Sequence, residues 1–129
     1  LAGLQSPSQV APVVAAIRQK SAEAGRPLDD DHYGAGFAFR FGSVDEPVVQ
    51  RQAAALSRLP EAPDPFTYLA AGDASAIAFR LREYIEAGIS KFVLRPIAES
   101  DEELMEQTAR LTEEVIPLFA TSRRAATAR

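Results

Sequence analysis

The sequence predicts an α/β protein with a parallel sheet, and three observations lead to this expectation. Two short apolar segments, residues 35–42 and 91–97, are typical of buried strands. Helices and strands follow one another along the chain, as in crossover units whose strands lie parallel. Apolar residues also recur at helical spacing in four segments, residues 6–25, 47–59, 72–88 and 100–117.

The first helix is expected over residues 6–25. Ser6 or Ser8 can cap its start, Pro12 lies near the first turn, and Gly25 supplies the stop. These signals enclose one apolar stripe, formed by Val10, Val13, Val14 and Ile17.

The segment 35–42 has the two-residue period of a strand, because Phe37, Phe39 and Phe41 alternate with smaller or polar residues. Aromatic side chains at this period are typical of a core. Stacking of these rings on a flavin is the functional alternative.

Weaker signals fill the middle of the chain. A second helix over 47–59 is expected to begin near Asp45, with Pro47 at the first helical position. The proline-rich loop 60–65 cannot continue a helix. It is followed by a short extended candidate at 66–71.

The clearest unit is a helix followed by a strand. Asp73 or Ser75 caps the helix within 72–88, Gly88 ends it, and 91–97 forms the strand.

The last helix, 100–117, opens with a capping box. Ser100 is expected to accept from the third helical amide while Glu103 reaches back, and Pro117 is expected to end the helix. Its apolar face is formed by Leu104, Thr108, Leu111 and Val115.

Composition narrows the classes of function. The 129 residues fit one domain, with 120–129 as a disordered tail, and the net charge of −4 argues against a nucleic-acid partner. The chain has no cysteine, which fits a reducing compartment, so we expect a cytoplasmic protein. No apolar run approaches the ~20 residues needed to cross a membrane, so no membrane partner is expected.

Two firm strands and one weak one cannot bury the faces of four helices. We therefore expect either a piece of a larger barrel or sheet, or chains that pair to complete one. The first residue is Leu1 rather than Met, which also favours a piece of a longer protein.

Residues 72–97, GDASAIAFRLREYIEAGISKFVLRPI, and the later phrase EELMEQTARLTEEVIPLF resemble the C-terminal end of the luciferase-like monooxygenase family. The turn EAGRPLDDDHYG resembles the entry to the seventh strand of that family. The resemblance covers about residues 10–119. The matching positions are Leu81, Tyr84, Ala87 and Gly88 in the helix, Phe92, Val93, Leu94, Arg95 and Pro96 in the strand, and Val115 with Pro117 at the end.

This resemblance implies the C-terminal part of a (β/α)8 TIM barrel: the last two βα units plus the preceding helix, with parallel strands and the barrel incomplete. It implies a flavin- or deazaflavin-dependent oxidoreductase that uses FMN or a deazaflavin (coenzyme F-420) when full length. The reaction would be hydride transfer or oxygen insertion on a small-molecule substrate, and the 129 residues alone are expected to be inactive. A homo-oligomer is also expected.

Four residues are the candidate cofactor contacts. Arg40 and Arg95 lie near the C-terminal ends of predicted strands, where a guanidinium can grip a phosphate or carboxylate in bidentate fashion. The alternative for either arginine is an internal ion pair, with Glu99 or Asp45 as the partner. Gly42 and Ser43 follow the first strand, and their amides can hold an anion.

The run of Asp29, Asp30 and Asp31 before His32 offers groups that bind metals or transfer protons. Adjacent side chains in an extended segment point in different directions, so a polar turn before the strand explains them more simply. His32 also precedes its strand and falls at the opposite face of a barrel from the active site. We therefore predict no metal ligand and no catalytic residue in this chain.

A second class of function is also open. The chain could be a non-catalytic α/β module that self-associates through its strand edges and binds a small ligand or protein partner.

Overall fold

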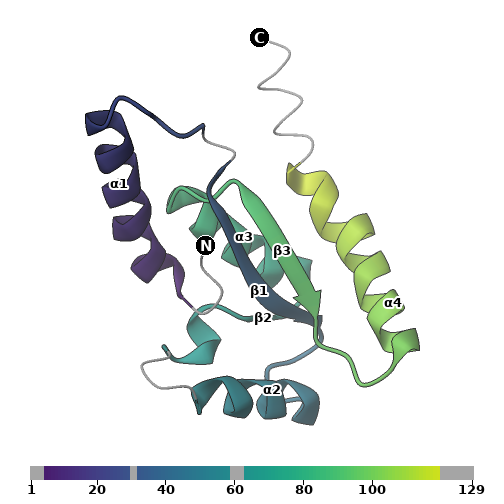
Figure 1. Cartoon of the computed structure of the whole chain (residues 1–129). Helices are drawn as coiled ribbons and strands as arrows, with labels where there is room; N and C mark the ends of the chain where they lie inside the picture. Colours follow the sequence, from purple (N-terminus) through teal and green to yellow (C-terminus); the bar gives the residue numbers. More distant parts are fainter. Residues whose placement is uncertain (1–4, 30–31, 59–62, 120–129) are drawn as a thin grey trace.

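Three parallel strands form one sheet in the computed structural model of the protein, which describes residues 5–29, 32–58 and 63–119 (Figure 1). The strands are β1 (Gly34–Phe41), β2 (Ala70–Gly72) and β3 (Lys91–Pro96), and their order is β2-β1-β3. The central strand β1 pairs with β3 over Gly34–Phe39 and with β2 only over Phe39–Phe41. The predicted α/β class and parallel sheet are therefore confirmed.

Four helices accompany the sheet: α1 (Pro7–Glu23), α2 (Pro47–Ser57), α3 (Ala74–Glu86) and α4 (Asp101–Arg110). Local capping explains where they begin. The Asp73 side chain accepts from the Ala76 amide at 2.9 Å, and Ser100 accepts from the Glu103 amide at 3.1 Å. At α1 the Gln9 side chain accepts from the Ser6 amide at 3.0 Å, so Ser6 rather than Ser8 is the cap.

The expected start of α2 near Asp45, with Pro47 at the first helical position, is confirmed, and the residue before the helix is Glu46. Two other expectations were wrong. Pro12 is the sixth residue of α1 and lies inside the helix rather than near its first turn. The extended candidate 66–71 becomes a strand only at its end, because Pro65–Thr67 form a short 3-10 turn (η2) capped by Asp64.

Pro117 does not end the last helix. The helix continues from α4 through a π-helical turn, η3 (Leu111–Val115), and remains helical through Phe119. The Ile116 amide bonds to the Leu111 carbonyl, five residues earlier. A proline ring collides with the carbonyl four residues before it in a regular α-helix. The wider π turn directly before Pro117 provides room for that ring.

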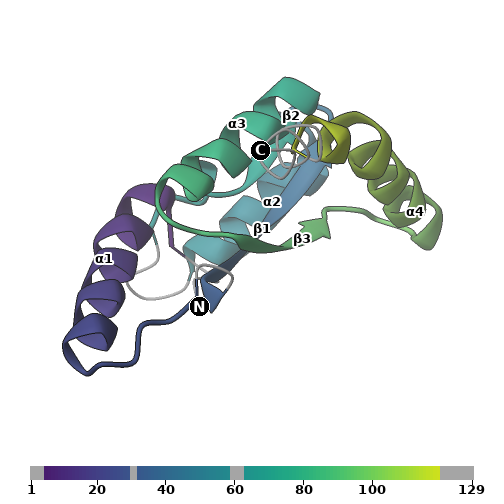
Figure 2. The ribbon, with the colours of Figure 1, turned by 90° about the horizontal axis from the view of Figure 1, so that it is seen from above.

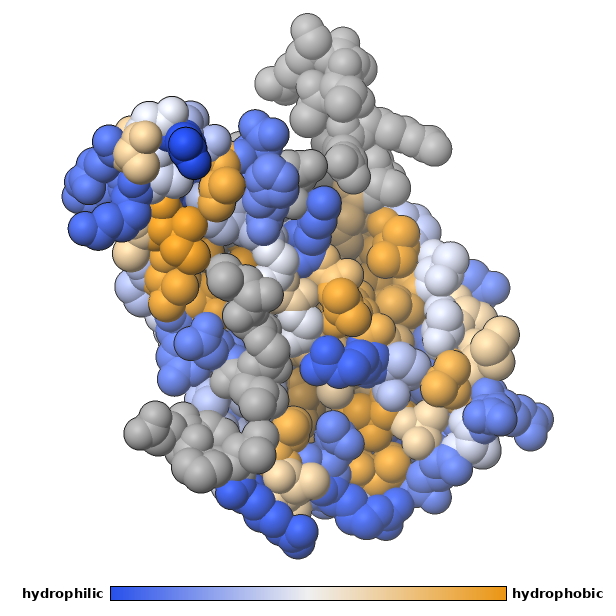
Figure 3. Space-filling view, viewed as in Figure 1, coloured by the Kyte–Doolittle hydropathy of each residue, from blue (hydrophilic) through white to orange (hydrophobic). Residues whose placement is uncertain are grey.

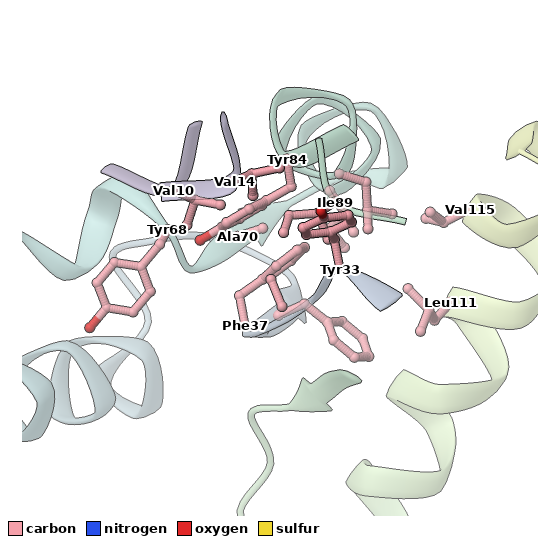
Figure 4. Packing of buried hydrophobic residues seen from close by; sticks show 14 of the residues in the cluster. Val10, Val14, Tyr33, Phe37, Tyr68, Ala70, Tyr84, Ile89, Leu111 and Val115 are labelled. Atoms are coloured by element: carbon pink, nitrogen blue, oxygen red, sulfur yellow. The ribbon is translucent and has the colours of Figure 1, made fainter. Parts of the chain in front are cut away.

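The core lies on one face of the sheet. Phe37 of β1 stacks on Tyr84 of α3 with ring centroids 5.5 Å apart and an interplanar angle of 9° (Figure 4). Phe39 is buried in the same cluster. Valines of α1 and the C-terminal helix close this core from either side. The prediction that the three phenylalanines are core residues is confirmed. Other buried members include Val10, Val14, Ile77, Leu81, Leu111 and Val115.

The opposite face is only partly covered. Val49 and Ala53 of α2 pack on Ala38 at the C-terminal end of the strands. Figures 1 and 2 show α3 behind β1 and β3, with α1 and α4 to either side, so these strands are seen in Figure 1 without a helix in front of them. Val93 on this face is 64% exposed. Apolar side chains gather in the middle of the same view in Figure 3.

Candidate functional site

Three of the four predicted contact residues meet at the C-terminal edge of the sheet. Arg40 is the penultimate residue of β1, and Gly42 and Ser43 follow the strand directly. The carboxylate of Glu46, the residue before α2, lies against all three. Arg95 lies on the neighbouring strand β3, opposite Ala38 of β1.

Carboxylates from two segments surround the guanidinium of Arg40. Its Nε and Nη2 lie 3.3 and 3.4 Å from the two oxygens of Glu46. Its Nη1 lies 2.6 Å from Oε1 of Glu103 and donates to the Ile97 carbonyl oxygen at 2.7 Å. Burial lowers the pKa of Arg40, but the hydrogen bonds with Glu103 and Glu46 outweigh it, so the pKa is raised.

The Glu46 carboxylate occupies the place where we expected an external anion. The Ser43 amide donates to its Oε2 at 2.9 Å. This backbone hydrogen bond, followed by the bond from Arg40, lowers the pKa of Glu46. A Cβ atom on Gly42 would overlap the same carboxylate, so glycine is needed for the close approach.

Arg40 forms an internal ion pair, which was the alternative to an anion site, but its carboxylate partners differ from those expected. Glu46 and Glu103 take the place proposed for Asp45 and Glu99. Glu99 instead pairs with Arg51 at 2.8 Å. The Glu103 side chain contacts Arg40 and does not complete the expected capping box at the start of α4, where Ser100 accepts from the Glu103 amide. One guanidinium with two carboxylates sums to −1, so the cluster does not attract a further anion. Cofactor contact by Arg40, Gly42 or Ser43 stays a prediction.

The buried amide of Gln107 is a second polar contact at this edge, and the sequence analysis missed it. Its Oε1 accepts from the Phe41 amide at 2.7 Å and its Nε2 donates to the Phe41 carbonyl at 3.2 Å. The pairing of β3 with β1 ends at Phe39, so the side chain supplies the partner that a neighbouring strand would have supplied. One signal was available: Gln107 lies on the same helical face as Leu104 and Leu111.

Arg95 has a different environment. It is exposed on the partly covered face of the sheet, and its Nη1 lies over Gly36 of β1, where an added Cβ would be 3.0 Å away. Among the residues that the structure describes, no carboxylate pairs with Arg95. The two predicted arginines therefore differ: Glu46 and Glu103 neutralise Arg40, whereas Arg95 is exposed and has no carboxylate partner among the described residues.

The acidic run before β1 forms a turn where the structure describes it. The His32 amide donates to the Asp29 carbonyl at 3.0 Å, and both residues are exposed. Asp30 and Asp31 lie outside the described residues. Across residues 5–29, 32–58 and 63–119, no three His, Cys, Asp or Glu side chains are grouped so that they could hold a metal ion.

No protein-family model matches the chain. No curated protein matches it either. Among the described helices, none is both long and apolar enough to span a bilayer. The function must therefore be argued from the motifs and from the geometry of the sheet.

Proposed function

We propose that the chain is the C-terminal part of a flavin- or deazaflavin-dependent oxidoreductase built on a luciferase-like (β/α)8 barrel. The observation that carries this proposal is the sheet with one face packed under helices and the other largely open. All-parallel sheets occur almost only with both faces covered. In a barrel the helices cover the outer face, and side chains from the other strands fill the inside.

The pairing of the strands supports the same proposal. The resemblance assigns β1 and β3 to the seventh and eighth barrel strands, which are neighbours in a barrel, and here they pair in parallel. On the other side of β1, β2 pairs only with Phe39–Phe41. In the described part of the chain no strand pairs with that edge over Gly34–Ala38, nor with the outer edge of β3. Both edges fit strands supplied by a longer chain.

The cofactor would be FMN or a deazaflavin, and it would supply the hydride transfer or the activation of oxygen. The part of this chain would be to shape one sector of the barrel mouth and to offer charge to the anionic end of the cofactor or substrate. Arg95 fits this role because its guanidinium is exposed and has no carboxylate partner among the described residues. Arg40 and the Gly42–Ser43 turn would hold that edge in shape through Glu46.

The test is purification of the protein from its complete reading frame, followed by titration with FMN and with a deazaflavin. We expect one of the two to co-purify or to bind with saturation, with absorbance near roughly 400–450 nm retained after gel filtration. The 129 residues expressed alone are the control and are expected to bind neither. A full-length protein that binds neither cofactor would contradict the proposal. Light scattering on the same sample tests the proposed homo-oligomer, and fractionation of cells tests the proposed cytoplasmic location.

The self-associating module is the second candidate, and the open edge of β3 favours it. An open edge of this kind pairs readily with another chain. In that case the 129 residues alone would form a stable dimer with no cofactor, and light scattering would separate this outcome from a monomer.

A further inference from the structure

The open face of β1 and β3 carries positive charge in an acidic protein. The two strands contain three basic residues, Arg40, Lys91 and Arg95, and no carboxylate, although the whole chain has a net charge of −4. Glu46 and Glu103 neutralise Arg40. Among the described residues no carboxylate pairs with Arg95, which is exposed on this face.

The register of the strands places three small residues of β1 opposite three residues of β3 on this face. Gly34, Gly36 and Ala38 of β1 lie opposite Lys91, Val93 and Arg95 of β3. The two glycines place no side chain beside the exposed Val93, and Gly36 is itself buried. A basic residue stands at each end of this strip, two residues from Val93 in either direction. The face therefore places an exposed apolar side chain, Val93, next to the exposed guanidinium of Arg95.

Gly36 controls where the Arg95 guanidinium lies. A Cβ atom at position 36 would lie 3.0 Å from Arg95 Nη1 and 2.8 Å from the Val93 carbonyl oxygen. The second distance is shorter than real Cβ contacts, so β3 would have to move away from β1. Because position 36 has no side chain, the Arg95 guanidinium can approach the backbone of β1 while the residue remains exposed.

From these contacts we propose that the open face of β1 and β3 binds an anionic group, phosphate or carboxylate, through Arg95, and that Gly36 is the positioning residue for its guanidinium. The planar fork of an arginine matches either anion in bidentate fashion. The inference deepens the proposed function and rests on it for the source of the anion, which is either the cofactor or the substrate. The binding of an anion at Arg95 can be tested without that assumption.

The first experiment is calorimetric titration of the full-length protein with inorganic phosphate. We expect saturable binding that weakens roughly tenfold or more in Arg95→Gln, as for loss of hydrogen bonds to a charged group. Arg58→Gln is the matched control, because Arg58 is exposed in the turn after α2 and the charge change is the same. Equal phosphate binding by the wild type and Arg95→Gln would overturn the inference.

The second experiment identifies the source of the anion by comparing FMN with riboflavin, which lacks the phosphate. If Arg95 holds the cofactor, the wild type prefers FMN, and Arg95→Gln loses that preference while Arg58→Gln keeps it. If Arg95 holds the substrate, the FMN preference is unchanged in Arg95→Gln, and phosphate or acetate still binds the FMN-saturated wild type through Arg95. Flavin binding with no effect of Arg95→Gln in either arm would overturn the inference and leave the proposed function intact. Phosphate binding at Arg95 without any flavin or deazaflavin binding would support the anion site and contradict the proposed function.

The role of Gly36 has its own readouts. In the wild type we expect a nuclear Overhauser effect between the Gly36 α protons and the Arg95 guanidinium, and its absence would overturn the positioning role. Gly36→Ala is expected to weaken phosphate binding severalfold although Arg95 is still present. If Gly36→Ala does not fold, Arg95→Lys replaces it, because lysine keeps the charge but loses the fork. Affinity in Arg95→Lys equal to that of the wild type would count against a positioned guanidinium.

Discussion

Replacement of Gln107 by methionine tests the polar contact that holds the end of β1. Methionine has a similar length and volume but removes both hydrogen bonds to the Phe41 backbone, at 2.7 and 3.2 Å. Gln107 is only 7% exposed, so water does not replace the lost partner easily. The buried N–H and C=O of Phe41 would each cost about 1–3 kcal/mol when left unsatisfied. Burial of the more apolar methionine side chain offsets about 1 kcal/mol of this loss through its transfer free energy.

The expected net loss in the free energy of unfolding for Gln107→Met is therefore about 1–5 kcal/mol. For a chain of 129 residues the entropy of unfolding is about 0.27 kcal/mol/K, so the midpoint should fall by about 4–18 °C. Urea denaturation followed by circular dichroism gives the free energy, and a thermal scan gives the midpoint.

Two further measurements make the Gln107 result specific. Glu106→Met, at the exposed neighbouring position, is the control and should change stability by less than about 0.5 kcal/mol. Hydrogen exchange at the Phe41 amide should accelerate in Gln107→Met beyond the change seen at other strand amides. A loss below about 0.5 kcal/mol for Gln107→Met would refute the reasoning that this side chain replaces a strand partner.

Three further predictions concern other parts of the molecule. The pKa of Glu46 is lowered in the folded protein, so the ionised Glu46 carboxylate stabilises the fold above its unfolded pKa, and this stabilisation is lost as pH falls through its folded pKa. Urea titrations at decreasing acidic pH should therefore show a smaller loss of stability in Glu46→Gln than in the wild type. Tyr84→Phe should cost about 1 kcal/mol by removing the 2.6 Å hydrogen bond to the Gln5 carbonyl. Burial raises the pKa of Tyr84 to about 12, so the wild type should also lose stability as pH rises from about 10 towards 12, and a Tyr84→Phe curve that falls equally would contradict this. Gly88→Ala should destabilise the protein by about 1–3 kcal/mol and so lower the thermal midpoint. Gly88 has φ +105°, and an added Cβ would lie 2.7 Å from Val14 Cγ1. An unchanged midpoint would show that the turn adapts.

Signals that act within a few residues were readable from the sequence. Ser100 and Asp73 cap their helices because a side-chain oxygen needs only to reach an amide three residues ahead. Gly88, with its positive φ, marks the end of α3 for an equally local reason. The alternation of Phe37 and Phe39 with smaller residues correctly identified the face of β1 that enters the core.

Pro117 shows where a local signal was overridden. A proline usually ends a helix, but here buried Leu111 and Val115 keep the C-terminal helix packed on the core. The helix therefore widens by a π turn and continues rather than stopping. The energy of packing decides this outcome, and spacing in the sequence does not reveal it.

The sequence by itself determined the order of helices and strands, the parallel class of the sheet and the apolar face of β1, because each depends on periodicity and on short-range capping. The tertiary structure alone decided which carboxylates meet Arg40, which side chain completes β1, and which arginine keeps an open charge. These contacts join residues far apart in the chain: Arg40 reaches Ile97 across 57 positions, and Phe41 reaches Gln107 across 66. Only the packing of the helices against the sheet sets those distances, so the charge of Arg40 is matched within the fold, while Arg95 has no carboxylate partner among the described residues.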